Sequence, residues 1–99
     1  MRLPPKAVRI IGKAVRALQD DPRARDTWRV WEERADNGDL PTNVAEVALK
    51  ALNFMDAYIS QSVQSARLDE DDRADLLNDL AFIRALEDRL KEDVALANA

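Results

Sequence analysis

The chain has 99 residues, and its 15 Lys and Arg against 19 Asp and Glu give a formal net charge of -4. It contains no cysteine and no histidine, which excludes disulfide frameworks, thiolate and imidazole metal sites, and catalytic devices built on either side chain. The length fits one domain over residues 1–99. No run of about 18 apolar residues is present, so we expect no membrane-spanning segment.

The side chains left for catalytic chemistry are carboxylates, lysine, arginine, one tyrosine and hydroxyl groups. From this poor inventory we expect no enzymatic activity, no metal site and no cofactor. The absence of cysteine is typical of a reducing compartment, and we expect a cytoplasmic protein.

The first predicted helix spans Pro5–Gln19, because proline suits the first helical turn. Its apolar residues recur at spacings of three and four: Val8, Ile11, Val15 and Leu18. The other side carries a basic stripe, which we define as Arg2, Lys6, Arg9, Lys13 and Arg16. This helix is therefore amphipathic, with a strongly basic outer face.

The second predicted helix spans Pro22–Asp36, with Asp21 as its N-cap. Trp28 and Trp31 lie on one face of it. We expect at least one of them to be buried against the third helix. The alternative is a contact surface, because tryptophan and arginine are enriched at binding hot spots and arginines surround the pair.

The third predicted helix spans Asn43–Ala66, without glycine or proline. Its apolar residues cover a wide arc from Val44 to Val63, and Phe54 and Tyr58 widen it further. A helix that is apolar over so much of its girth packs on more than one side. We therefore expect this helix at the centre of the fold, with Tyr58 half-buried in the core.

The fourth predicted helix begins after its N-cap Asp69 and runs to about Leu96. The sequence thus predicts an all-α, four-helix bundle-like domain, in which a long hairpin of the last two helices is overlaid by two shorter ones. Two short helices cannot cover a long hairpin on every side. We therefore predict a homodimer through the remaining apolar face.

Charge is distributed unevenly along the chain. Residues 1–34 hold nine basic and five acidic residues, a net of +4, whereas residues 35–99 hold six basic and fourteen acidic residues, a net of -8. The basic stripe could lie in solvent or bind an acidic protein, nucleic acid or lipid. Nucleic acid is disfavoured by the low pI of about 4.8 and by the lack of aromatic residues within the stripe.

Six carboxylates concentrate around the start of the fourth helix: Asp69, Glu70, Asp71, Asp72, Asp75 and Asp79. Acids in a first helical turn stabilise the positive end of the helix dipole, but six exceed that need. The segment 71–75 matches the DDxxD motif of prenyl synthases, yet their second motif and large cavity are missing. The segments 32–36 and 72–75 are similar to the EExxE and ExxD motifs of helical nucleotide pyrophosphohydrolases, with Asp in place of Glu at two positions.

These features together predict a small acidic protein-binding module, such as an inhibitor, an immunity or antitoxin-like protein, or an adaptor. A basic protein partner would be attracted by the six carboxylates. In length, acidity and helix count the chain resembles the small acidic immunity proteins that block secreted nuclease toxins, without sharing their motifs. The alternative is a nucleic-acid-associated regulator that binds through the basic amphipathic first helix. The alternative contact residues are Arg9, Lys13, Arg16, Trp28 and Trp31.

Overall fold

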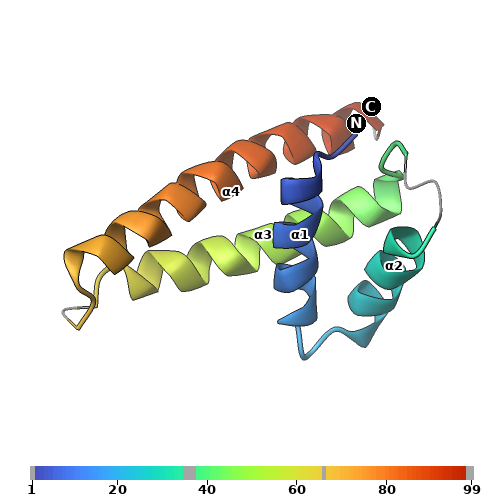
Figure 1. Cartoon of the computed structure of the whole chain (residues 1–99). Helices are drawn as coiled ribbons and strands as arrows, with labels where there is room; N and C mark the ends of the chain where they lie inside the picture. The colour runs from blue at the N-terminus through green and yellow to red at the C-terminus, as the bar shows by residue number, and fades with distance from the viewer. Residues whose placement is uncertain (1, 35–37, 66, 98–99) are drawn as a thin grey trace.

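The computed structural model describes residues 2–34, 38–65 and 67–97. These residues form four helices and no strand. The helices are α1 (Pro5–Arg16), α2 (Pro22–Glu32), α3 (Thr42–Ser62) and α4 (Glu70–Ala97). The all-α architecture predicted from the sequence is confirmed, and so is the long α3–α4 hairpin (Figure 1).

The starts of α2 and α4 follow the predicted capping residues, whereas α3 begins at Thr42, one residue earlier than predicted, and has no side-chain cap. The side chain of Asp21 accepts a hydrogen bond of 3.0 Å from the backbone N–H of Ala24, and Asp69 accepts one of 2.8 Å from the N–H of Asp72. These carboxylates satisfy backbone donors that have no partner within the helix.

The helix ends differ more from the predictions. α1 ends at Arg16 and not at Gln19, because the N–H groups of Ala17 and Leu18 turn to carbonyls three residues back and tighten the chain. α2 ends at Glu32 and α3 at Ser62, and their predicted last residues lie outside the described part of the chain. α4 continues to Ala97, one residue past its predicted end.

α3 lies at the centre of the fold, as predicted. It runs beside α4 along the hairpin, α1 crosses it, and α2 lies along its N-terminal part (Figure 1). Small buried residues allow these close approaches: Ala45, Ala48 and Ala51. The wide apolar arc of α3 therefore follows from its contacts with three other helices.

Both tryptophans of α2 belong to the core. Trp28 and Trp31 are 2% and 3% exposed, and their ring centroids lie 5.0 Å apart. The indole Nε1 of Trp28 donates a 2.7 Å hydrogen bond to Glu32. Gly12 of α1 lies directly against this indole, where a Cβ atom would come within 3.3 Å of Nε1. The same Cβ atom would come within 3.0 Å of the Glu32 carboxylate, so these side chains would have to shift by a few tenths of an ångström.

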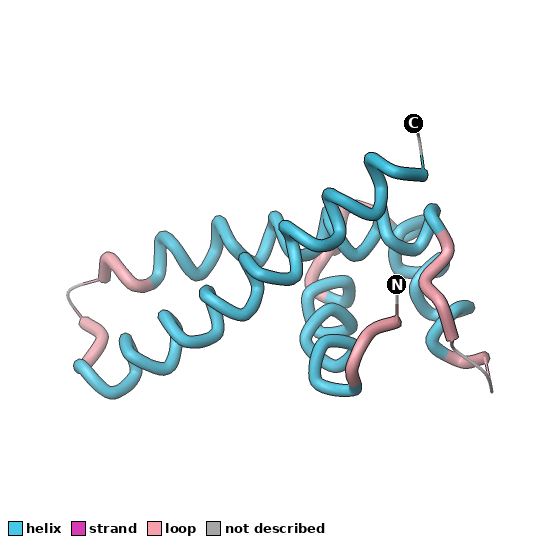
Figure 2. Tube along the Cα trace, turned by 90° about the horizontal axis from the view of Figure 1, so that it is seen from above, coloured by secondary structure: helices cyan, strands magenta, loops and turns pink. Residues whose placement is uncertain are grey.

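One half of the hairpin extends beyond α1 and α2 (Figures 1 and 2). We call this half the free arm and define it as residues 54–65 and 67–83, which end α3, cross the described part of the loop and begin α4. Within α4, the first buried residue is Leu80. The radius of gyration is 14.2 Å, compared with about 12.6 Å for a compact domain of this length.

The prediction that Tyr58 is half-buried in the core is wrong. Tyr58 is 62% exposed, and Phe54 is 44% exposed. Tyr58 lines an open groove beside Ile10 and Lys13 of α1, so α1 lies near its side chain without covering it. Phe54 also lies in the free arm, which extends beyond α1 and α2 (Figure 1).

Candidate protein-interaction surface

The six predicted contact carboxylates all lie on the free arm. Asp69 caps α4, and the other five occupy its first three turns with exposed side chains. Within residues 2–34, 38–65 and 67–97, none of the six takes part in an ion pair. The ion pairs of this part of the chain join Arg29 to Asp26 and Glu33, Lys50 to Asp21, and Arg84 to Asp56.

Arg73 holds the loop at the tip of the free arm. Its Nε donates to the carbonyl of Val63 at 3.1 Å, and its terminal nitrogen donates to the carbonyl of Ser65 at 3.0 Å. These bonds satisfy backbone acceptors at the end of α3. The arginine thereby fixes the geometry of the acidic tip, a role that its sequence context did not reveal.

The basic stripe lies on α1 except for Arg2, which precedes the helix, and Arg9, Lys13 and Arg16 are exposed. None of these three forms an ion pair with the acidic residues of the free arm in the described structure. Lys6 is held differently, because its Nζ lies 4.6 Å from the ring centroid of Phe82 on α4. This cation–π contact joins α1 to the hairpin.

A groove separates α1 from the free arm. It has a volume of about 360 Å³. Its lining residues come from α1, α3 and α4: Ile10, Lys13, Met55, Tyr58, Ile59, Leu76, Asp79 and Ile83. Six of the residues that line this α1–arm groove are apolar or aromatic, while Lys13 from α1 and Asp79 from α4 supply opposite charges. The structure therefore brings one residue of the basic stripe and one of the six carboxylates to the same surface.

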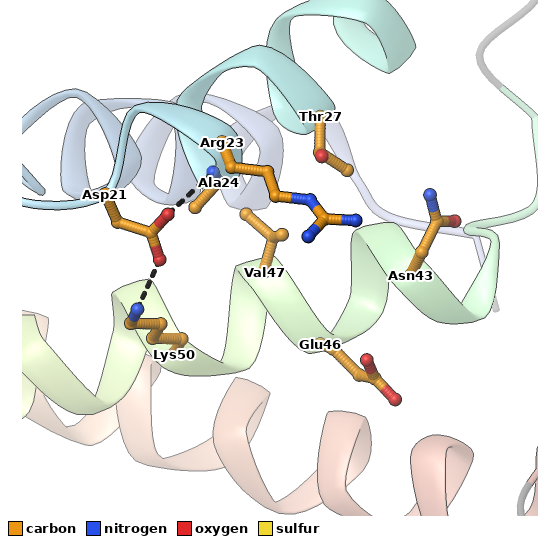
Figure 3. A pocket seen from close by; sticks show the side chains of 8 residues that line it. All are labelled: Asp21, Arg23, Ala24, Thr27, Asn43, Glu46, Val47 and Lys50. Atoms are coloured by element: carbon orange, nitrogen blue, oxygen red, sulfur yellow. Dashed lines mark hydrogen bonds and ion pairs between the residues drawn. The ribbon is translucent and has the colours of Figure 1, made fainter.

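A second hollow lies between α2 and α3 and is polar (Figure 3). Lys50 donates a hydrogen bond to Asp21, which also accepts one from the backbone of Ala24. The bond from Lys50, followed by the backbone bond, lowers the pKa of Asp21 below its usual value. Arg23 and Glu46 line the same hollow, so its two cations are balanced by two carboxylates. The Asp21–Lys50 pair ties the start of α2 to α3.

A carboxyl pair lies between α3 and α4 at the root of the free arm. Glu87 is 6% exposed, and burial, followed by a hydrogen bond to Asp56, raises its pKa to about 7. Burial alone would raise the pKa of Asp56, but hydrogen bonds from Arg84, Glu87 and Ser60 outweigh burial and lower it. Glu87 therefore carries the proton of the pair and Asp56 the charge. Arg84 lies 3.3 Å from the Asp56 carboxylate.

Sequence reasoning missed this pair, although a signal existed. Glu87 lies four residues after Ile83 and three before Leu90, on the buried stripe of α4. An acid in that position must be neutral or paired, because burying an isolated charge is costly. Arg84 balances the negative charge of the carboxyl pair. We therefore assign the pair a structural role in the packing of α3 on α4.

Burial divides the other contact residues predicted from the sequence into core residues and surface residues. Trp28 and Trp31 are core residues, so the alternative contact set retains Arg9, Lys13 and Arg16 on the surface. Among the described residues, no group of three or more acidic side chains is placed to hold a metal ion. None of the helices in that part of the chain is long and apolar enough to cross a membrane.

Comparison with known proteins gives no match: no family model, no curated protein and no solved structure is similar to this chain.

Proposed function

We propose that this chain is a protein-binding module, of the kind found among inhibitors, immunity or antitoxin-like proteins and adaptors, and that it contacts a basic protein through the free arm. One observation carries the proposal. The arm concentrates six carboxylates, and none of them pairs with a cation of the described chain.

The number of these carboxylates exceeds what folding uses. Asp69 caps α4, and the acids of the first turn interact favourably with the helix dipole, each by about 0.3–1 kcal/mol. Asp75 and Asp79 lie beyond that turn, where the dipole effect has fallen off. A dense patch of one sign instead attracts an oppositely charged protein and raises the association rate.

The arm also offers apolar contact area. Tyr58, Phe54 and Leu77 are 62%, 44% and 49% exposed. Aromatic side chains contribute strongly to binding energy when a partner buries them. In this proposal the carboxylates accelerate encounter, and the apolar side chains slow dissociation.

Rigidity supports the same function. The arm consists of two packed antiparallel helices, and Arg73 fastens the loop between them. A surface that is already ordered loses little conformational entropy when it binds. The carboxylates are therefore presented in a fixed arrangement.

The second candidate function uses α1. Arg9, Lys13 and Arg16 are exposed and could contact nucleic-acid phosphates, as a regulatory protein would. The acidic arm beside α1 opposes this function, because it repels the same phosphates. We therefore favour a protein partner.

The test compares two triple variants that change the net charge equally. Asp71→Asn, Asp72→Asn and Asp75→Asn neutralise the arm, while Glu46→Gln, Asp88→Asn and Glu92→Gln neutralise exposed acids outside it. Wild type and both variants are immobilised and exposed to lysate of the native host and to duplex DNA. Captured proteins are quantified by mass spectrometry and then purified for association kinetics.

We expect that wild type and the control variant capture a basic protein and that the arm variant does not capture it. Its association rate with wild type should fall steeply with ionic strength, because screening acts over about 10 Å at 0.1 M salt. Equal capture by the two triple variants would contradict a role of the arm. Binding of duplex DNA in the absence of protein capture would favour the α1 function.

A further inference from the structure

The molecule exposes more surface than a compact monomer of its size. Its accessible area is 6639 Å², whereas a compact protein of 11.2 kDa exposes roughly 5,700 Å². The excess, roughly 900 Å², is close to the 800 Å² or so that each partner buries in a stable interface of standard size. The free arm is the part of the fold that lacks cover (Figure 2).

The α1–arm groove combines a mostly apolar lining with one charge of each sign. Ile10 from α1 and Ile59 and Leu76 from the hairpin belong to the apolar lining. Lys13 lies on the α1 wall and Asp79 on the α4 wall, and the two do not form an ion pair with each other. A surface that complements this groove must therefore be mostly apolar, with an acidic group opposite Lys13 and a basic group opposite Asp79.

A second copy of the chain has that arrangement. If a two-fold axis runs along the groove, rotation about it places the α4 wall of each copy opposite the α1 wall of the other. Lys13 of each copy then faces Asp79 of its partner, and the apolar linings meet. Two-fold dimers use such self-complementary patches, in which every contact occurs twice.

We propose that the α1–arm groove is the interface of a symmetric homodimer, held by apolar contact around Tyr58 and by two Lys13–Asp79 ion pairs. Tyr58 lines the groove and is the most exposed of its aromatic or aliphatic residues. A tyrosine at the centre of an interface provides a large, rigid contact surface. The dimer shares Tyr58 and Asp79 with the surface of the proposed function, but it does not involve Asp71, Asp72 and Asp75 near the tip of the arm.

Charge reversal tests this interface. Lys13→Glu and Asp79→Lys each place like charges opposite one another at two symmetric sites, whereas the double variant restores opposite charges with the sign exchanged. Both side chains are exposed, so the fold should persist, and circular dichroism checks this. The matched controls are Arg9→Glu and Asp71→Lys, which make the same charge changes on the same helices outside the groove lining.

Sedimentation equilibrium measures the result. We expect wild type to approach 22.4 kDa, twice the 11.2 kDa of the chain, as its concentration rises through the micromolar range. Each single reversal should raise the dimer dissociation constant by about tenfold, and the double variant should restore it to near the wild-type value. The controls should change it by much less.

A wild-type protein that stays at 11.2 kDa over this range would overturn the proposal. So would a dimer whose single reversals behave like the controls, or whose double variant shows no recovery. Lys13→Glu leaves all six carboxylates of the arm intact, so loss of the dimer in this variant and loss of the proposed partner are separate results.

Discussion

The two halves of the α3–α4 hairpin are built from the same helices but differ in how they are covered. Where α1 and α2 cover it, α3 has small buried residues such as Ala48 and Ala51, which belong to one core with the large side chains of Trp28 and Trp31. In the free arm the helices pack mainly on each other, and large side chains such as Tyr58 remain exposed. Stability is therefore concentrated in the covered half, and we place binding in the arm.

The comparison also explains where the carboxylates lie. The covered half is stabilised by apolar packing and by the Asp21–Lys50 pair, and its exposed acids share the surface with the arginines and lysines of α1 and α2. The arm is narrow, and little of it can be buried in a monomer. Six carboxylates keep such an exposed hairpin charged, which gives it a field that a basic protein can recognise.

The largest expected effect is the contrast between Trp28 and Tyr58. Trp28→Ala should lower the free energy of unfolding by about 3–5 kcal/mol, because it removes a buried aromatic ring. Tyr58→Ala should change it by less than about 0.5 kcal/mol, as surface substitutions usually do. Urea denaturation followed by circular dichroism measures both values, at protein concentrations low enough to keep the chain monomeric. Equal losses of unfolding free energy in the two variants would mean that the free arm is covered.

The next effect tests the boundary between the halves, where Glu87 lies. Burial raises the pKa of Glu87 to about 7 in the folded chain, above its ordinary value of 4.5. Between these values the folded state holds a proton that the unfolded state has released. The free energy of unfolding should therefore fall as pH rises from 4.5 to 7, by up to about 3 kcal/mol.

The absence of histidine makes this effect easy to isolate, since no imidazole titrates in the same window. Glu87→Gln keeps a hydrogen-bond donor toward Asp56 and removes the proton equilibrium. The variant should lose the decline in stability between about pH 5 and about pH 8. Asp88→Asn, an exposed neighbour on α4, is the control and should retain it. A wild-type stability that is flat over this range would show that Glu87 ionises freely.

A smaller effect compares the caps of the two regions. Asp21→Ala should cost about 1–2 kcal/mol, because it removes the cap of α2 and the bond to Lys50 that ties α2 to α3. Asp69→Ala removes a cap alone and should cost about 1 kcal/mol or less. Lys50→Met separates the two roles of Asp21, since it spares the cap. Thermal unfolding measures the stability of all three variants. A larger loss of stability in the Asp69 variant than in the Asp21 variant would contradict the expected order of the two regions.

The smallest expected change in stability per substituted residue belongs to the tip of the arm. Asp71→Asn, Asp72→Asn and Asp75→Asn together should lower the free energy of unfolding by about 0.6–2 kcal/mol, the dipole interactions of Asp71 and Asp72, because none of the three carboxylates forms an ion pair in the described chain. Thermal melts at low and high salt measure this change. A large destabilisation would mean that the acids act within the fold and are not held for a partner.

The period of apolar residues predicted much of this fold. It predicted the four helices, the burial of a tryptophan such as Trp28 and the central position of α3, because helical periodicity and capping chemistry are local properties of the chain. The prediction for Tyr58 was wrong because the sequence shows that a residue is apolar but not how far a neighbouring helix extends. The groove between Lys13 and Asp79 was also beyond sequence reasoning, since it depends on the angle at which α1 crosses the hairpin.

Amide hydrogen exchange resolved by residue tests the central claim, that the free arm is a folded but uncovered contact surface. In dilute wild-type protein, the amides of the covered half should be protected more strongly than those of the arm. Raising the concentration, or adding the captured basic protein, should slow exchange in the arm and leave α2 unchanged. Exchange in the arm that responds to neither, or protection that rises in α2 instead, would contradict the account.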